Sequence, residues 1–285
     1  MLPEKKQLPP GLYFVATPIG AARDITLRAL DVLASADVLA AEDTRTLRHL
    51  MQLHGLSAGE RPVIAYHDHN GAEVRPRLIR LMREGRSVAY ASEAGTPLVA
   101  DPGYPLAREA IAEGLRVVPV PGPSAVTAAL TVAGLPTDRF LFAGFPPAAP
   151  GARAAWMQEL KAVPATLVFY ESPKRIHRTL GELCEVLGSE RQAAVCRELT
   201  KRFEEVLRGT LSELEEQVAE HPPKGEIVLV VDRGRAVASE EDMETALRDA
   251  LQQMSVKDAA AEVARALGLP RRQVYQAALE LEKQR

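Results

Sequence analysis

The stretch Ala91-Ser-Glu-Ala-Gly-Thr-Pro-Leu-Val-Ala-Asp-Pro-Gly103 is both rigid and polar, and it follows the apolar run 87–91, which predicts a buried strand. Its two glycines allow backbone angles or close approaches that a Cβ would forbid, and its two prolines fix φ on either side of Leu98-Val-Ala100. Small ligands bind at the carboxyl ends of the strands in an open α/β sheet, where this loop should lie. The same residues would also suit a tight strand-to-helix connection made of two turns.

Short apolar runs alternate with amphipathic segments from Leu12 onward, a pattern typical of β-α units stacked on a largely parallel sheet. Five strands are expected, over residues 12–17, 37–41, 63–66, 87–91 and 116–120. Polar clusters follow their carboxyl ends at residues 17–20, 42–45, 67–70, 93–97 and 122–124. Helix capping alone would not require two Thr-Pro pairs and a Pro-Gly-Pro, so we interpret this sheet edge as the site.

After Leu135-Pro136 the strand-like runs become longer and more aromatic, which predicts a second α/β domain with a mixed sheet. Its strands are expected over residues 138–145, 166–170, 192–196, 203–207 and 226–231, its helices over 176–187 and 211–218, and a turn or mobile loop over 146–151. The expected division of the chain is a tail (1–11), an N-terminal α/β domain (12–135), a C-terminal α/β domain (136–235) and a helical extension (236–285).

The extension is expected to contain three helical segments from Ser239 onward, the last two separated by Gly268-Leu-Pro270. Residues 257–275 resemble a helix-turn-helix, with Arg271 and Arg272 opening its second helix. Between residues 239 and 285 acidic side chains slightly outnumber basic ones, so we favour a packed helical appendage over a DNA clamp driven by charge.

Composition excludes several classes of protein. The 285 residues are 46% hydrophobic and 26% charged, as in an ordinary globular protein, and no apolar run reaches the length of a membrane span. No apolar signal core precedes the first strand, so a cytoplasmic location is expected. Cys184 and Cys196 lie in no metal or redox spacing and are expected to be buried as small apolar residues. The net charge of -3 excludes binding of nucleic acid by bulk charge and leaves local basic patches open.

The usual cofactor and metal signatures, Gly-x-Gly-x-x-Gly, the P-loop and His-Glu-x-x-His, are absent from the sequence. His67-Asp-His69 could supply metal ligands, but side chains at i and i+2 of a strand end diverge, so a polar substrate contact is favoured and no metal is predicted. Glu171 is followed by Lys174, Arg175, His177 and Arg178, a cationic patch that suits a phosphate backbone or, alternatively, a solvated first helical turn.

These motifs occur together, in unbroken order between residues 11 and 233, in one known family. The segments are Thr17-Pro-Ile-Gly20 with Asp24-Ile-Thr26, Ala41-Glu-Asp-Thr-Arg45, His67-Asp-His-Asn70, residues 92–97 with Asp101-Pro-Gly103, Pro121-Gly-Pro-Ser124, Gly134-Leu-Pro136, Tyr170-Glu-Ser172, Arg197-Glu-Leu-Thr-Lys201 and Lys224-Gly-Glu226. With them the chain resembles the ribosomal RNA small subunit methyltransferase I family of tetrapyrrole-methylase-like (class III) S-adenosylmethionine methyltransferases. The helical tail resembles the helix-turn-helix extension that many members carry.

The resemblance implies two α/β domains with S-adenosylmethionine in the cleft between them, a homodimer, and methyl transfer to the ribose 2′-oxygen of a cytidine in the decoding region of 16S ribosomal RNA. It leaves open whether the substrate is free RNA or the small ribosomal subunit. By position, it implies cofactor contacts from Glu93, Gly95, Thr96, Pro97, Ser124, Ala125, Tyr170, Lys224, Gly225 and Glu226. The sequence departs from the family's pattern at Ala21 (usually Asn), at Glu93 (usually Asp) and at Gly151-Ala-Arg153, where a basic Gly-Arg-Arg linker is usual.

Methyl transfer from a sulfonium requires the acceptor oxygen to lie in line with the S–methyl bond, so positioning should supply much of the acceleration. We hypothesise that Glu171, or alternatively Glu198, takes the proton of the ribose hydroxyl and that Lys201 stabilises the developing alkoxide. Contacts with the RNA are expected from Arg45, His67, His69, Lys174, Arg175 and Arg197.

Two other functions fit parts of the sequence. A small-molecule methylase acting on a tetrapyrrole of the precorrin type would share the fold and the cofactor but would need a roomy apolar bowl, whereas this cleft edge is rich in Arg, Lys and His. A ligand-sensing, nucleic-acid-binding regulator would use Arg271 and Arg272 to bind a duplex and would transfer no methyl group.

Overall fold

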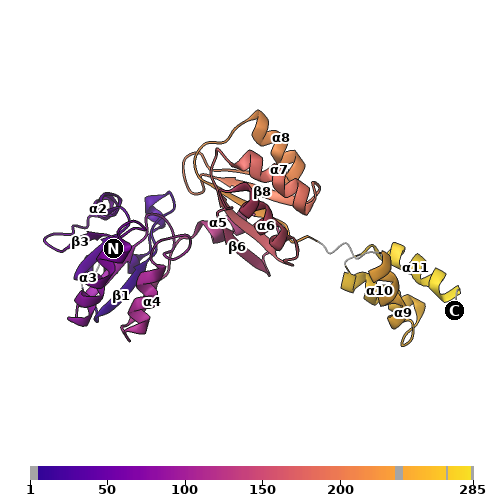
Figure 1. Cartoon of the computed structure of the whole chain (residues 1–285), viewed down its shortest axis with the longest axis horizontal. Coiled ribbons are helices and arrows are strands. Elements are labelled where there is room, and N and C mark those ends of the chain that lie inside the picture. Colours follow the sequence, from indigo (N-terminus) through magenta and orange to yellow (C-terminus); the bar gives the residue numbers. More distant parts are fainter. Residues whose placement is uncertain (1–5, 235–239, 268, 284–285) are drawn as a thin grey trace.

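The structure is a computed structural model that describes residues 6–234, 240–267 and 269–283. It contains two α/β domains and a group of three C-terminal helices that Figure 1 shows apart from them. This arrangement confirms the predicted fold class. The first residues of the expected tail, the expected boundary at 235/236, Ser239 and Gly268 lie outside the described residues.

The first sheet is parallel throughout, in the order β3-β2-β4-β1-β5. Its strands are β1 (Gly11–Val15), β2 (Val38–Ala41), β3 (Val63–Ala65), β4 (Ser87–Ala91) and β5 (Val117–Val120). The last residues of β1, β2 and β4 are level in the sheet, because Ala91 is paired with both Val15 and Ala41. Three of the predicted polar clusters therefore start at one edge, as expected for parallel strands.

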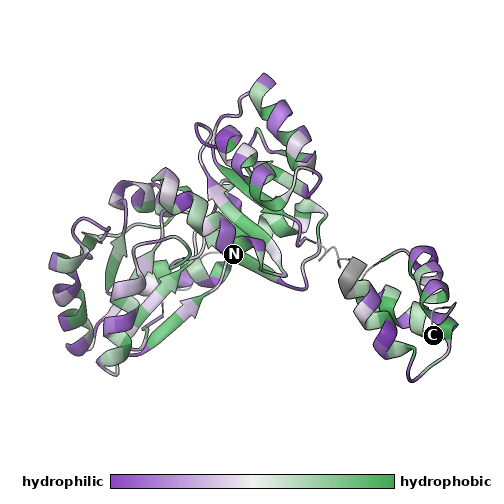
Figure 2. Ribbon diagram, turned by 45° about the vertical axis from the view of Figure 1, so that its right-hand side comes forward, coloured by the Kyte–Doolittle hydropathy of each residue, from purple (hydrophilic) through white to green (hydrophobic). Residues whose placement is uncertain are grey.

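Helices cover both faces of this sheet. They are α1 (Leu27–Ser35), α2 (Thr44–Leu53), α3 (Gly71–Arg83) and α4 (Tyr104–Ala112), and the short helix η1 (Ala22–Asp24) before α1 has no buried residue. Apolar residues of α1 and α2 pack on one face, and those of α3 and α4 pack on the other. Because both faces are covered, the strands are almost continuously apolar, which is why their runs were visible in the sequence. Figure 2 shows hydrophobic strands inside both α/β domains.

The second sheet is mixed, as predicted, in the order β6-β7-β10-β8-β9. Its strands are β6 (Phe140–Gly144), β7 (Thr166–Glu171), β8 (Gln192–Arg197), β9 (Glu205–Thr210) and β10 (Ile227–Val231). Only β6 and β7 are parallel neighbours, and the other pairs are antiparallel. One face is covered by α6 (Pro150–Lys161), α7 (Ile176–Leu187) and α8 (Leu211–Glu220).

The other face of the second sheet is covered by α5 (Ala125–Ala133), which follows the last strand of the first sheet. Its buried residues Val126, Ala129 and Leu130 join one apolar cluster with residues of β7, β8 and β10. Figure 1 shows α5 beside the second sheet. The helix that precedes the expected boundary at 135/136 therefore packs with the second domain, and it joins the two domains through a shared core.

Two local elements have other bounds than expected. Residues 146–151 are not simply a loop, because α6 begins at Pro150, and a proline fits the first turn of a helix. The strand expected at 203–207 begins only at Glu205, because the carboxylate of Glu204 accepts a hydrogen bond from the backbone N–H of Thr200 (2.6 Å) and closes a turn before it.

The described residues after 239 form three helices, as predicted. They are α9 (Glu240–Ala250), α10 (Val256–Leu267) and α11 (Arg271–Lys283). A small apolar cluster that includes Leu247, Val263 and Val274 holds them together. Arg271 and Arg272 open α11 and are exposed. None of the helices in the described ranges is long and apolar enough to cross a membrane.

Arg153 in α6 is buried, with 1% of its surface exposed, although the sequence suggested a remnant of a basic linker. Its guanidinium donates to both carboxylate oxygens of Glu182 in α7 (2.5 and 2.7 Å) and to the carbonyls of Pro147 and Ala148 (3.1 and 2.9 Å). Arg153 thus fixes the 146–149 loop to α7. Its hydrogen bonds hold the pKa of Glu182 below the ordinary range of a glutamate.

We predict that Glu182→Ala lowers the free energy of unfolding by about 3 kcal/mol, because it leaves a buried guanidinium unpaired. Urea denaturation at pH 7 measures this loss, and the double variant Arg153→Leu/Glu182→Leu should recover most of it. A carboxylate with a depressed pKa stabilises the fold above its unfolded pKa and loses that effect as pH falls. The difference between wild type and Glu182→Ala should therefore shrink below about pH 4. A difference that does not change with pH would contradict the ion pair.

Candidate functional site

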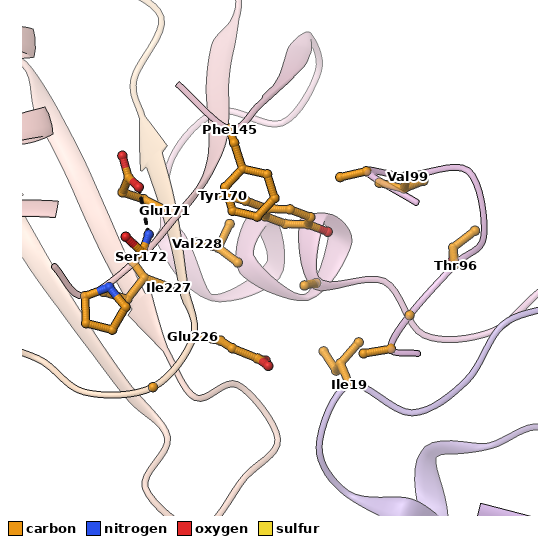
Figure 3. A pocket seen from close by; sticks show the side chains of 16 residues that line it. Ile19, Thr96, Val99, Phe145, Tyr170, Glu171, Ser172, Glu226, Ile227 and Val228 are labelled. Carbon is orange, nitrogen blue, oxygen red and sulfur yellow. Dashed lines mark hydrogen bonds between the residues drawn. The ribbon is translucent and has the colours of Figure 1, made fainter. Parts of the chain in front are cut away.

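A cavity of about 370 Å³ lies between the two α/β domains. It is lined by Ile19 of the first domain, by Ala94, Gly95, Thr96, Val99 and Ala100 after β4, by Ala125 of α5, and by Phe145, Tyr170, Glu171, Ser172, Pro173, Gly225, Glu226, Ile227 and Val228 of the second domain. Figure 3 shows Thr96 and Val99 across this space from Tyr170 and Glu226. The loop that follows β4 is therefore one wall of the cavity.

This loop is held in place by its own hydrogen bonds. The backbone groups of Thr17 and Gly95 bond each other in both directions (3.0 and 3.1 Å), and the Ser92 hydroxyl donates to the Gly95 carbonyl (2.6 Å). Gly95 has a φ of 79°, which favours glycine. The Thr96 hydroxyl donates to the Pro123 carbonyl (2.8 Å), so the Pro-Gly-Pro segment is tied to the same wall.

The second half of the loop carries backbone strain. Leu98 and Ala100 have φ values of 70° and 54°, although neither is glycine. Asp101 holds this conformation, because its carboxylate accepts from the Tyr90 hydroxyl and from the Gly103 amide, both at 2.9 Å. Burial raises the pKa of Asp101. Strained loops that the surrounding structure fixes in this way are common at binding sites.

The opposite wall is aromatic. The ring of Tyr170 contacts those of Phe142 and Phe145 edge to face, at centroid distances of 4.8 and 5.5 Å. Figure 3 shows the Tyr170 hydroxyl pointing across the cavity toward the loop after β4. Burial, together with the charge of Glu226, raises the pKa of Tyr170, so this hydroxyl stays protonated at neutral pH and can donate a hydrogen bond.

Two carboxylates and an ammonium meet at the rim of the cavity. Lys201 Nζ lies 2.9 Å from Glu198 Oε1 and 3.0 Å from Glu226 Oε2. Glu198 also accepts from the Glu226 backbone N–H (2.9 Å), which lowers the pKa of Glu198 together with its bond to Lys201. Burial disfavours the charge on Lys201, but its bonds to the two carboxylates outweigh burial and raise its pKa. Lys201 is therefore a fixed cation beside the cavity.

The loop that carries this group also contacts the first domain. Glu198 and Thr200 have φ values of 50° and 64°, and the Thr200 hydroxyl accepts from the Ala21 backbone N–H (3.1 Å). A Cβ on Gly20 would lie 2.5 Å from Lys201 Cγ, so only glycine allows this approach. The predicted motifs at 17–20 and 197–202 thus meet across the domain boundary.

The sequence suggested Glu171 as a base, and in the structure its carboxylate is bonded to protein groups. Glu171 is 3% exposed; it accepts from the Thr179 hydroxyl (2.7 Å) and from the Ser172 backbone N–H (2.8 Å), and it pairs with Arg175 (3.4 Å). Successive side chains of a strand point to opposite faces, so Tyr170 faces the cavity and Glu171 faces α7. Figure 3 shows its carboxylate directed away from the cavity. Glu171 anchors the start of α7.

The structure divides the residues that were expected to contact a cofactor. Gly95, Thr96, Ala125, Tyr170, Gly225 and Glu226 line the cavity. Pro97 and Ser124 line neighbouring hollows, and the exposed residues Glu93 and Lys224 are not among the lining residues. The charge of Glu93 contributes, after burial, to the raised pKa of Glu42, so it lies toward the end of β2. Sequence reasoning missed Val99 and Phe145 because apolar residues carry no chemical signature.

The residues expected to contact RNA lie in both α/β domains, and several are bonded to protein groups. Arg175 and Arg197 are partly buried; Arg175 donates to the Pro146 carbonyl, and Arg197 donates to Glu205 (3.0 Å) and to the Lys224 carbonyl (3.2 Å). Lys174 is exposed. In the first domain, exposed Arg45 pairs with Asp43 (2.9 Å), and the rings of His67 and His69 lie 6.0 Å apart.

Comparisons with known proteins agree with this geometry. Residues 11–215 match the family model of the tetrapyrrole (corrin/porphyrin) methylases, and residues 237–282 match that of the RsmI C-terminal HTH domain. The chain is 51% identical to ribosomal RNA small subunit methyltransferase I of Mesorhizobium japonicum, over 97% of this chain and 94% of the relative. It is 45% identical to the protein of the same name from Xylella fastidiosa, over 94% and 98%. The uroporphyrin-III C-methyltransferase of Thermus thermophilus, solved with S-adenyl homocysteine, has the same fold (TM-score 0.53, 22% identity, 78% of this chain and 97% of that chain).

We predict that Gly225→Ala weakens S-adenosylmethionine binding at least tenfold. Gly225 has a φ of 90°, and a Cβ there would lie 2.3 Å from Glu198 Oε1, so the substitution should displace Glu198 and the adjoining cavity wall. Gly114→Ala is the matched control, because Gly114 has a φ of 68° with open space around it. Both variants should lose about 1 kcal/mol of stability from strain, but isothermal titration should show weaker binding only for Gly225→Ala. Equal affinities of the two variants for S-adenosylmethionine would contradict the role of the turn at Gly225 in shaping the cavity wall.

Proposed function

The chain belongs to the tetrapyrrole (corrin/porphyrin) methylases and, within them, to the group of the ribosomal RNA small subunit methyltransferase I relatives, and from this premise we propose that it methylates a cytidine ribose of 16S ribosomal RNA at the 2′-oxygen. The methyl donor is S-adenosylmethionine. The observation that carries the proposal is the Glu198–Lys201–Glu226 group, which lies at the rim of an interdomain cavity opposite the loop after β4.

The residues of the cavity fit S-adenosylmethionine. About 370 Å³ is within the usual range for a small-ligand pocket, and Ala94, Ala125 and Gly225 let a ligand approach the backbone closely. The apolar side chains of Ile19 and Val99 exclude water from the same space. When bound, the cofactor supplies an electrophilic methyl group on a sulfonium, and these residues hold it.

Glu226 is the proton acceptor in this proposal, in place of Glu171. It lines the cavity, its side chain is 74% exposed, and Figure 3 shows its carboxylate directed into the space opposite Ile19. Lys201 stabilises the negative charge that develops on the ribose oxygen, and Glu198 holds Lys201 in place. A positioned base typically contributes a factor of about 10² to 10⁴ to the rate.

The proposed RNA substrate also bears on the cellular location and the partners of the protein. We propose that a homodimer acts in the cytoplasm on the small ribosomal subunit. Analytical ultracentrifugation tests the dimer. Parallel assays with free 16S RNA and with assembled, unmodified small subunits show which substrate is used.

We predict that wild-type protein transfers labelled methyl from S-adenosylmethionine to unmodified small subunits, and that nuclease digestion with mass measurement locates the label on the ribose of one cytidine. A tetrapyrrole such as uroporphyrinogen III serves as the competing substrate. Transfer to the tetrapyrrole and none to the subunits would overturn the proposed substrate.

We predict that Glu226→Gln and Lys201→Met each lower kcat about 100-fold or more while the Kd for S-adenosylmethionine changes less than threefold. Glu171→Gln should lower the melting temperature, because it weakens the anchor of α7, and should leave kcat within threefold of wild type. Single-turnover methylation with saturating cofactor measures the step. A large loss of kcat in a stably folded Glu171→Gln protein would return the proton-accepting role to Glu171.

A further inference from the structure

The connection between β8 and β9, residues 198–204, presents an arginine and an aromatic ring at the surface. Phe203 is 61% exposed, and the guanidinium carbon of Arg202, itself an exposed residue, lies 5.4 Å from the centre of its ring. An exposed phenyl ring adds little to the stability of the fold. An arginine beside an aromatic ring is the combination with which proteins hold unpaired nucleotides, by stacking on a base and pairing with a phosphate.

This tip is rigid. The Lys201 backbone N–H donates to the Glu198 carbonyl (2.9 Å), and the Glu204 N–H donates to the Lys201 carbonyl (3.2 Å). The Glu204 carboxylate accepts from the Thr200 N–H (2.6 Å), which closes the loop a second time. Because the backbone is already fixed, little conformational entropy would be lost when a ligand binds.

The tip also adjoins the cavity. Lys201, the residue before Arg202, contacts Glu226 on the cavity wall, and Thr200 contacts Ala21 of the first domain. A ligand on Arg202 and Phe203 would therefore lie next to whatever enters the cavity. A nucleotide chain has the required shape, because the nucleotide to be methylated can reach the mouth of the cavity beside the cofactor while its neighbour lies outside.

Arg202 is available for a phosphate, whereas its neighbours are not. Arg197 is paired with Glu205, and Lys201 is paired with Glu198 and Glu226. Over the described part of the chain, no ion pair involves Arg202. The carboxylates that follow it in sequence are bonded elsewhere, because Glu204 accepts from the Thr200 backbone N–H and Glu205 pairs with Arg197.

The geometry points to Arg202 and Phe203 as a binding site for a single-stranded RNA segment that flanks the nucleotide to be methylated. Phe203 stacks on an unpaired base, and Arg202 pairs with the adjoining phosphate. This inference rests on the proposed RNA substrate and adds a site to it that lies outside the cavity.

The test compares full-length Phe203→Leu, Phe203→Tyr and Arg202→Gln with two controls far from the tip in sequence, Tyr104→Leu (61% exposed) and Arg80→Gln (68% exposed). The readouts are the Kd for a fluorescent single-stranded RNA oligonucleotide with the decoding-region sequence, KM for unmodified small subunits, and the Kd for S-adenosylmethionine.

Stacking is worth about 1–3 kcal/mol per base, so Phe203→Leu should raise the Kd for the oligonucleotide and KM for the subunits about tenfold, whereas Phe203→Tyr stays within twofold. Arg202→Gln should weaken binding several-fold and reduce the slope of log Kd against log salt by about one. The controls should match wild type, and every variant should bind S-adenosylmethionine with wild-type affinity.

Three results would overturn the inference. The first is an unchanged RNA Kd and KM in Phe203→Leu while wild type methylates the subunits, which leaves the proposed function standing. The second is a Phe203→Leu protein that no longer forms a dimer but whose monomer binds RNA with unchanged Kd. That result would make the tip a contact between copies of the chain. The third is an equal rise of the RNA Kd and of KM in Phe203→Leu and Phe203→Tyr. If wild type methylates no RNA at all, the proposed function fails, and oligonucleotide binding still tests the tip.

Discussion

The short turn from Thr17 to Ala21 is the constraint on which the site depends. At one end, its backbone pairs with Gly95 and fixes the loop after β4. At the other end, the Ala21 N–H bonds the Thr200 hydroxyl, and Gly20 leaves room for the side chain of Lys201. Between these contacts, Ile19 packs into the core that both domains share. A single turn thus sets the positions of both cavity walls, so changes at residues that touch no ligand can alter binding.

The second connection between the domains is the apolar face of α5. A helix that follows the last strand of a parallel sheet usually packs on that same sheet, but α5 covers β7, β8 and β10 instead. Ala125, at the start of this helix, lines the cavity, and the Pro-Gly-Pro segment before it is tied to Thr96. Burial of the face of α5 therefore stabilises the second domain and places a cavity wall at the same time. The cavity is a consequence of how the two cores are joined.

Charged residues that looked equivalent in the sequence have different roles in the fold. Arg153, Arg175 and Arg197 donate to backbone carbonyls or to partner carboxylates, so they connect loops to helices and strands. Glu171 is likewise an anchor, because the alternation along β7 turns it toward α7 while Tyr170 faces the cavity. By contrast, Lys201 and Glu226 lie at the rim. A carboxylate beside cations in a sequence indicates pairing, and only the direction of each side chain shows whether that pairing serves the structure or the reaction.

The sequence by itself determined the strands and their order along the chain, because buried parallel strands require continuous apolar runs, and it determined the polar edge at residues 92–97, because glycine and proline constrain the backbone locally. It also determined the family, through short motifs kept in order. The tertiary structure decided which motifs meet. The pairing of residues 17–21 with 198–201, the crossing of α5 and the direction of Glu171 all depend on contacts between residues far apart in the chain. Local propensity carries no information about such contacts, because burial and side-chain direction are fixed only when the two sheets pack together.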